Sequence, residues 1–320
     1  MAMLLRHLLA LPALLIATPS GAESADPPTP ASVVAAAPAG DWRAIAPADL
    51  LVMTLAPDAG RSPRQVVIQL MPAPFSQPWV QNIRTLAKAH WWDGTTVYRV
   101  VDNWVAQWGD GEDDKAKAKA LPVGVVSPVA DYETTLDTRT FSGTNVPARA
   151  EGRSDPYADE TRFFLGWPVA SNKGSPRAWP VHCYGSVGVA RDLAPDTGTG
   201  AELYAVIGHA PRALDRNIAV VGRVIEGIEH LSTLPRGKGD AGVYDNAALK
   251  VPILSVRPGN ELSDPPRFEY LASDSASFAR YVAVRANRSD SFYRVPAGGV
   301  DICNVQVPIR RVAAPGKVGR

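Results

Sequence analysis

The pattern of apolar and polar positions predicts short strands separated by turns over much of the chain. Runs of β-branched and other apolar residues alternate with clusters rich in glycine, proline and aspartate, which is typical of strands joined by loops. Two strands are expected within residues 95–108, and six more at residues 50–55, 65–71, 185–190, 202–207, 219–224 and 250–256. Few of them are separated by helical patterns, so the segments favour an antiparallel barrel, which leaves no free strand edge.

Apolar residues recur at helical spacing in three segments. The first helix is expected to begin after Ser76 as its N-cap, with Pro78 in the first turn, and to end near His90. A second, short helix would place on one face Ile225, Ile228, Leu231 and Leu234. A third is expected over residues 275–286. The sequence therefore predicts two helices that cap the barrel and one helix in a C-terminal extension.

Composition divides the chain after residue 22 into three parts. Residues 23–47 are rich in proline, alanine, serine and threonine and predict a flexible linker. Residues 48–258 carry the strand pattern, with a long insertion at 111–182 that is expected to pack locally around its aromatic residues. Residues 259–320 form a C-terminal extension.

The first 22 residues have the pattern of a secretory signal peptide. Arg6 is followed by an apolar run over residues 8–17 and by the small residues Ser20, Gly21 and Ala22. The run is short for a membrane span, so cleavage before Glu23 is expected rather than an uncleaved anchor. The mature protein is then expected to be periplasmic or secreted, without membrane insertion.

Charge and the few metal-binding side chains exclude some functions. The 320 residues contain 33 Lys and Arg against 32 Asp and Glu, so no net field favours nucleic acid. The histidines after residue 22 lack the spacing of a zinc motif, and neither a metal nor a cofactor is expected. Cys183 and Cys303 are the two cysteines, and in an oxidising compartment they form either one disulfide or two separate buried thiols.

The most informative stretch is residues 92–110. Asp93-Gly94 opens it and Gly109-Asp110 closes it, and these are turn residues. Between them, Arg99 and Gln107 lie among apolar and aromatic neighbours. Such a set of residues can hold a small apolar group and place one strong hydrogen-bond donor over it.

These residues resemble the central signature of the cyclophilins, the peptidyl-prolyl cis-trans isomerases. The resemblance covers roughly residues 50–257, interrupted by the insertion at 111–182. Its parts are Asp93-Gly94, Tyr98-Arg99-Val100, Gln107, Gly109-Asp110, and then residues 185–190, 199–204, 214–215 and 221–227. It implies a mainly β fold: a closed eight-stranded antiparallel barrel with two capping helices, here with a long loop insertion and a C-terminal extension.

The resemblance also implies roles for single residues. Arg99 would be the catalytic donor, and Gln107 would bind the substrate backbone and orient Arg99. The substrate-binding residues would be Trp104, Val105, Glu202, Leu203, Tyr204 and Ile218. Of these, Trp104, Val105, Tyr204 and Ile218 would form the wall of a proline pocket. The alternative for all four is ordinary barrel core, above all for Val105 and Ile218. The partners would be proline-containing polypeptides, with the protein itself a monomer.

Several positions depart from the usual family pattern. The departures are Tyr98 for His, Trp104 for Phe, Val105 for Met, Glu202 for Gln, Tyr204 for Phe and Ile218 for His. An ion pair between Glu202 and Arg99 could hold the arginine away from substrate. Two functions therefore remain open: an isomerase that assists the folding of exported proteins, and a module that binds proline loops or acts as a chaperone with little turnover.

Overall fold

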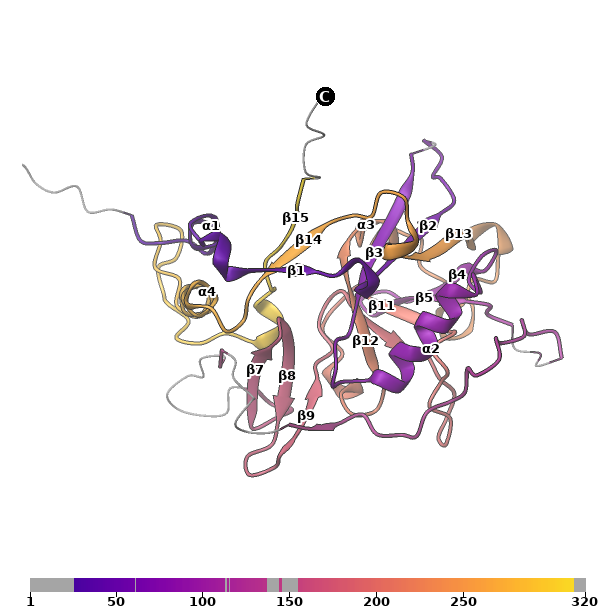
Figure 1. Ribbon diagram of the computed structural model, residues 1–320, viewed down its shortest axis with the longest axis horizontal. Coiled ribbons are helices and arrows are strands. Elements are labelled where there is room, and N and C mark those ends of the chain that lie inside the picture. The colour runs from indigo at the N-terminus through magenta and orange to yellow at the C-terminus, as the bar shows by residue number, and fades with distance from the viewer. Residues whose placement is uncertain are drawn as a thin grey trace, which may run out of the picture.

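Eight antiparallel strands close into a barrel (Figure 1). The computed structural model describes residues 26–60, 62–112, 114, 116–136, 144–145 and 155–313. In spatial order the barrel strands are β10 (Ser186–Val189), β11 (Leu203–Val206), β5 (Val105–Gly109), β4 (Thr96–Val100), β13 (Val251–Pro258), β2 (Leu50–Leu55), β3 (Arg64–Leu70) and β12 (Val220–Glu226). All eight strands that the sequence predicts belong to it, and the predicted fold class is confirmed.

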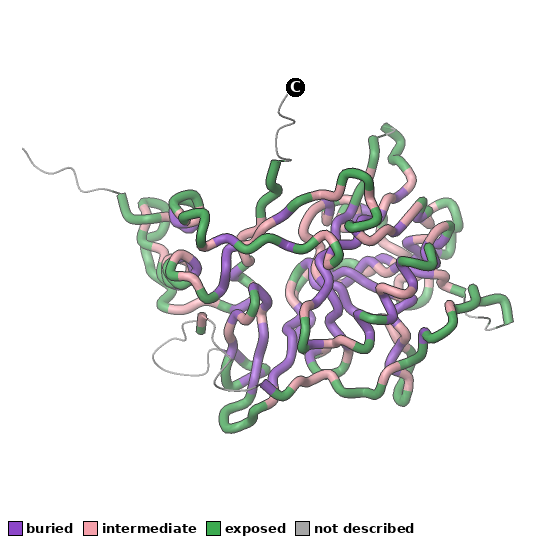
Figure 2. Tube along the Cα trace, viewed as in Figure 1, coloured by how far each residue is buried: buried purple, intermediate pink, exposed green. Residues whose placement is uncertain are grey.

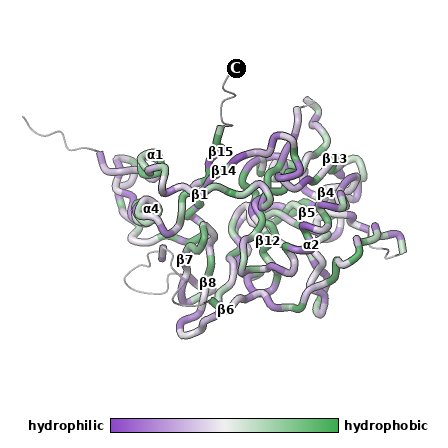
Figure 3. Tube along the Cα trace, in the orientation of Figure 1, coloured by the Kyte–Doolittle hydropathy of each residue, from purple (hydrophilic) through white to green (hydrophobic). Residues whose placement is uncertain are grey.

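Strand β2 shows why a continuous apolar run forms a strand here. Leu51 and Met53 face the barrel core, whereas Leu50 and Val52 lie in a separate apolar cluster on the outer face. Successive side chains of a strand point to opposite faces, so both faces of β2 are buried. The apolar residues accordingly collect on the barrel strands (Figure 3).

Helix α2 (Gln77–Lys88) packs its apolar face against β12 and β13. Its buried apolar residues are Trp79, Val80, Ile83, Leu86 and Ala87. Ser76 does occupy the N-cap position, but the expected capping bond is absent there: Ser76 is in the left-handed region at φ 53° and its side chain accepts no hydrogen bond from the helix.

A second body lies beside the barrel and is built from three separate parts of the chain (Figure 1). One small sheet joins β1 (Trp42–Ile45), β14 (Phe268–Leu271) and β15 (Ile309–Arg311), and another joins β6 (Thr134–Thr135), β9 (Arg177–Pro180), β8 (Trp167–Ser171) and β7 (Glu160–Phe164). Helices α1 (Pro30–Ala35) and α4 (Ala276–Ala286) pack against each other. Their shared core includes Val33, Trp42, Phe163, Trp179 and Phe278, so this flanking body has buried residues of its own (Figure 2).

The prediction of a flexible linker over residues 23–47 is wrong for the part that the structure describes. Pro30–Ala35 is a helix whose N-cap Thr29 accepts a 3.1 Å hydrogen bond from the Ser32 backbone N–H. Trp42 then begins strand β1 and is buried. A few apolar side chains are enough to order this segment because the C-terminal extension supplies the rest of their core. The predicted signal peptide, residues 1–22, lies outside the described residues.

The insertion and the second capping helix also differ in detail from the sequence analysis. The insertion forms strands β6 to β9, which join in one sheet. The sequence analysis expects only local packing around its aromatic residues. Helix α3 is a single turn, Glu229–Ser232, and Ile225 belongs to strand β12. The C-terminal helix begins where expected, with Ser275 as a capping side chain. Within the described ranges, no helix has the length and apolar character needed to cross a membrane.

Cys183 and Cys303 form a disulfide across 120 residues of sequence. The bond connects the segment before β10 to the C-terminal extension, and therefore joins the flanking body to the barrel. Closing so long a loop removes much of the chain entropy of the unfolded state.

Replacing both cysteines by serine should therefore lower the free energy of unfolding by about 2–4 kcal/mol. Urea denaturation of the oxidised protein and the double variant measures the difference. The reduced wild type should resemble the double variant. Equal stability of the oxidised and reduced proteins would show that the bond does not constrain the fold.

Candidate active site

A bulge between β4 and β5 brings together the residues that the sequence singled out. Arg99 and Gln107 lie opposite each other on the two strands, and the register shifts between Val97 and Arg99. An extra residue at such a bulge re-aims its side chain. Tyr98 and Arg99, although adjacent in sequence, consequently both reach Gln107.

Two of the three guanidinium nitrogens of Arg99 are held by the protein. Nη1 donates a 2.9 Å hydrogen bond to Gln107 Oε1, and Nε donates one of 2.7 Å to the Ala241 carbonyl. The loop that carries Ala241 is itself bonded to β4, through Gly237 N to Val100 O at 2.8 Å and Tyr244 N to Tyr98 O at 2.9 Å. Nη2 makes no hydrogen bond to the described chain, so it remains available to another molecule.

Gln107, Tyr98 and Glu202 continue the hydrogen bonds away from Arg99. Gln107 Nε2 donates to the Tyr98 hydroxyl, which donates a 2.8 Å hydrogen bond to Glu202 Oε2. The Asp110 backbone N–H donates to Glu202 Oε1 at 2.7 Å. The carboxylate at one end therefore fixes the direction of every bond, and the carbonyl oxygen of Gln107 faces Arg99.

The two glycines around Asp110 make room for this chain of bonds. A Cβ on Gly109 would lie 2.1 Å from a carboxylate oxygen of Glu202, and one on Gly111 would lie 2.8 Å from the ring of Tyr98. Side chains at either position would displace Glu202 or Tyr98. The turn that closes the signature stretch is thus part of the site's packing.

Burial raises the pKa of Glu202 above its ordinary value, although the hydrogen bonds from Tyr98, Asp110 and Gly111 act in the opposite direction. Burial also raises the pKa of the Tyr98 hydroxyl, and the nearby Glu202 charge adds to this effect. The tyrosine therefore remains a hydrogen-bond donor to the carboxylate.

The raised pKa of Glu202 predicts a pH dependence of stability. A carboxyl group with a raised pKa contributes stability that is fully present below its ordinary pKa of 4.5 and is lost as the pH rises through the folded value. Replacing Glu202 by Gln should remove that loss. In urea denaturation, the variant should become more stable relative to wild type as the pH rises from about 4 to about 7. Parallel stability curves would contradict this account of Glu202.

Next to the polar groups lies a separate apolar cluster. Val105 and Tyr204 are buried in it, with Trp104, Leu214 and Ile218 packed against them. Tyr204 lies opposite Gln107 on the neighbouring strand. Gly188 allows its ring to pack closely, because a Cβ there would lie 2.3 Å from the Tyr204 hydroxyl oxygen. Trp104, Val105, Tyr204 and Ile218 are thus brought together beside Arg99 and Gln107.

Behind Tyr204 lies a buried network of charged and polar side chains. The ring nitrogens of His182 lie 3.0 Å from Asp215 Oδ1 and 3.1 Å from the Tyr204 hydroxyl oxygen. Because the carboxylate accepts from Nδ1–H, Nε2 of a neutral imidazole accepts from Tyr204. Arg212 donates to Asp215 Oδ2 at 2.6 Å and also bonds Asp155. All five residues are buried, so the network fixes the ring of Tyr204.

Two expectations about the site need correction. The Leu203 side chain is not placed to bind substrate, because it lies in the barrel core, on the strand face opposite to its neighbours Glu202 and Tyr204. Glu202 does not pair with Arg99: the described ion pairs include none between them, and its oxygens bind Tyr98 and the Asp110 backbone.

The sequence analysis includes Tyr98 and Leu214 in the resemblance but assigns neither a role in the site, and it misses the Ala241 carbonyl and the network behind Tyr204. The only signal for that network was the extra hydroxyl of Tyr204, since a buried tyrosine hydroxyl needs a partner.

The closed barrel, with an arginine and a glutamine beside an apolar cluster on its surface, has the architecture of a prolyl isomerase. The family model for cyclophilin type peptidyl-prolyl cis-trans isomerases matches residues 63–257. The chain therefore belongs to the cyclophilin family and is a peptidyl-prolyl cis-trans isomerase. No curated protein matches it in a sequence search.

Two solved structures are similar to it. The cyclophilin AquaCyp293 from Hirschia baltica is 20% identical, with a TM-score of 0.64, over 90% of this chain and 99% of that one. A cyclophilin type isomerase from Cryptosporidium parvum is 11% identical, with a TM-score of 0.37, over 68% of this chain and 99% of that one. The first similarity supports the fold.

Proposed function

We propose that Arg99 catalyses rotation about Xaa-Pro peptide bonds of polypeptides whose proline ring lies against Trp104, Val105, Tyr204, Leu214 and Ile218. The observation that carries this proposal is the position of the Arg99 guanidinium beside that apolar cluster. Gln107 and Ala241 hold it, and its Nη2 has no partner within the described part of the chain.

The chemistry follows from the peptide bond itself. Rotation breaks amide resonance, which gives a barrier of about 18–20 kcal/mol. In the twisted amide the nitrogen becomes pyramidal and regains a lone pair that can accept a hydrogen bond. A guanidinium donor beside this nitrogen stabilises the twisted state more than the planar ground state, which lowers the barrier. No bond is made or broken, and no proton is transferred.

Gln107 acts here as a positioning residue for Arg99. Its orientation depends on the Tyr98 hydroxyl, which accepts from the amide N–H₂ while it donates to Glu202. Without that hydroxyl, the amide could rotate its N–H₂ group toward the arginine. Glu202 therefore supports the catalytic geometry from a distance instead of restraining Arg99.

Replacing Tyr98 by Phe should lower kcat/KM by about 3- to 10-fold, the value of one ordinary hydrogen bond. The loss should appear in kcat with KM nearly unchanged, because Tyr98 acts through Gln107. Tyr281→Phe removes a similarly bonded hydroxyl from the flanking body and should leave both constants unchanged. An unchanged kcat in Tyr98→Phe would show that the hydroxyl does not orient the site.

The second function, a module that binds proline loops with little turnover, is favoured by one observation. The proline-pocket residues differ from the usual family pattern, with Tyr204 and Ile218 in place of Phe and His. Against it, the donor and its positioning residue are both in place. A protease-free assay on a cis-enriched Xaa-Pro peptide separates the two functions, since a binding module would leave the isomerisation rate at its uncatalysed value.

We further propose that the protein is exported, acts as a monomer, and accelerates the folding of exported proteins whose slow step is prolyl isomerisation. The signal-like residues 1–22 and the disulfide, which is typical of an oxidising compartment, support export. Refolding a test protein that is limited by prolyl isomerisation should become faster in proportion to enzyme concentration. Fractionation of cells that express the full chain should recover it outside the cytoplasm. A slow phase that the enzyme leaves unchanged would contradict the folding role.

A further inference from the structure

A cavity of about 1030 Å³ lies between the barrel and the flanking body, away from the prolyl site. Strand β12, helix α4, the residues before β10 and those leading into β15 line it, and none of the catalytic or proline-pocket residues does. Its volume is at the upper end of the range of small-molecule sites. It is therefore large enough for a ligand of its own.

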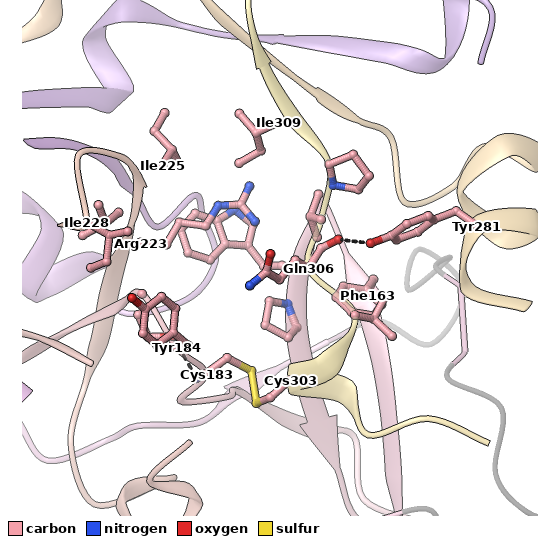
Figure 4. A pocket seen from close by; sticks show the side chains of 18 of the residues that line it. Phe163, Cys183, Tyr184, Arg223, Ile225, Ile228, Tyr281, Cys303, Gln306 and Ile309 are labelled. Atoms are coloured by element: carbon pink, nitrogen blue, oxygen red, sulfur yellow. Dashed lines mark hydrogen bonds between the residues drawn. A yellow bond between two sulfur atoms is a disulfide. The ribbon is translucent and has the colours of Figure 1, made fainter. Parts of the chain in front are cut away.

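The walls of this cavity are mostly apolar and aromatic. Figure 4 shows Ile225 and Ile228 on one side, Phe163 and Tyr281 on the other, and Ile309 above. These side chains come from the barrel, the insertion and the C-terminal extension. A ligand here would contact all three parts through an apolar body.

Arg223 extends into this apolar setting (Figure 4), and among the described residues its hydrogen-bond acceptors are neutral. Its Nε and Nη2 donate to Gln69 Oε1 at 2.9 and 2.7 Å, and its Nη1 donates to the Gly166 carbonyl at 2.7 Å. A guanidinium has five N–H groups, so one N–H on each terminal nitrogen has no acceptor among the described residues. Two such groups match the two oxygens of a carboxylate.

The charge of Arg223 is also not balanced by its neighbours. Its guanidinium lies 4.3 Å from the ring centre of Trp167, and none of the ion pairs in the described ranges involves it. Burial lowers the pKa of Arg223 to about 9. The Arg223 side chain is part-buried, and charges held in such surroundings are normally paired, so an anion placed here would supply the missing partner.

Other charges around the cavity leave it net basic. Arg285 donates to the Asn304 carbonyl at 2.5 Å and has no acidic partner among the described residues. Of the two lining acids, Glu226 is paired with Arg311, and Glu229 is exposed to solvent. Arg288 is paired with Asp290. Among the described residues, Arg223 and Arg285 are thus the lining arginines without an acidic partner.

A second donor at the cavity also lacks an acceptor. Trp167 lines the cavity and is 2% exposed, and its indole N–H is buried without a hydrogen-bond partner in the described chain. Such orphan donors are uncommon in native proteins. The amide of Gln306 lies in the same cavity (Figure 4), so three kinds of donor are present.

We propose that this cavity is a second binding site, which takes a small amphipathic carboxylate. The carboxylate accepts the two remaining N–H groups of Arg223, and the apolar body lies against Ile225, Ile309 and Tyr281. This site is independent of the prolyl isomerase site and does not require turnover.

Calorimetric titration with decanoate and with decanol tests the proposal on the full, oxidised protein. Decanoate should bind saturably with Kd below about 1 mM, and decanol about tenfold or more weaker. Arg223→Gln should weaken decanoate binding by about tenfold or more. Arg84→Gln, which removes an arginine from the outer side of α2, should leave decanoate binding unchanged. An Xaa-Pro substrate peptide should not displace decanoate.

Arg223→Gln could also unfold the protein, so a second variant tests the same site. Ile309→Trp fills the cavity without removing a charge, and it should weaken decanoate binding by a similar factor while circular dichroism remains that of wild type. The proposal is overturned if decanoate does not bind, if decanol binds equally well, if folded Arg223→Gln or Ile309→Trp binds like wild type, or if the substrate peptide displaces decanoate.

Discussion

Replacing Arg99 by Ala should lower kcat/KM for an Xaa-Pro peptide by about 10²- to 10³-fold, the usual effect of removing one preorganised donor from a developing charge. The apolar cluster beside Arg99 does not depend on the guanidinium, so peptide binding should fall much less. Arg99→Lys should recover only part of the activity, because the ammonium cannot donate to Gln107, Ala241 and substrate in the same planar arrangement. The protease-free isomerisation assay measures all three proteins.

Arg84→Ala is the matched control for this prediction. Arg84 is a partly exposed arginine paired with Asp49 on the outer side of the barrel, and its removal changes the net charge equally. Its kcat/KM should equal that of wild type. If Arg99→Ala keeps wild-type activity, Arg99 is not the catalytic donor.

The second large effect concerns the buried network behind Tyr204. Arg212→Ala should lower the free energy of unfolding by about 3–5 kcal/mol, because it leaves two buried carboxylates, Asp155 and Asp215, without their shared cation. Denaturant unfolding at neutral pH measures this loss. Activity of the folded fraction should also fall, since Asp215 orients His182 and His182 holds the Tyr204 hydroxyl.

Arg216→Ala is the comparison for Arg212→Ala. Arg216 lies four residues further along the chain and pairs with Glu133, but 47% of its side chain is exposed. An exposed pair contributes less than about 1 kcal/mol. A similar loss in both variants would show that burial of the Arg212 network is not what stabilises the fold.

The barrel could be predicted from the sequence because each strand carries its own local signal. Segments such as residues 50–55 and 219–224 have runs of apolar residues bounded by turns, and the observed strands lie within one or two residues of them. The signature stretch could be placed on two strands for the same reason. Local patterns, however, do not show which distant segments share a core.

The flanking body shows this limit most clearly. Residues 30–45 contain too few apolar side chains to predict order alone, and they fold because Val33 and Trp42 find partners more than 200 residues away, such as Phe278 and Leu271. The same holds for strands β7 to β9, whose core is completed by α4. Such pairings depend on the three-dimensional arrangement and leave no periodic signal in either segment.

Within the site, the sequence predicted the residue types better than their connections. Arg99 and Gln107 are in contact as expected, yet Glu202 binds Tyr98 and not Arg99. The bulge at Tyr98, which decides this, depends on one extra residue in β4 that the pattern does not reveal. The network behind Tyr204 connects side chains that lie as far apart in sequence as Asp155 and Asp215. The sequence alone does not show that these side chains meet.

The most direct test of the central claim is exchange NMR on an Xaa-Pro peptide at equilibrium, with wild type and with Arg99→Ala. The same spectra report binding, through chemical shifts, and the rate of cis–trans interconversion. We expect both proteins to bind the peptide and only wild type to accelerate interconversion strongly. Binding by wild type without acceleration, or equal acceleration by both proteins, would contradict the account.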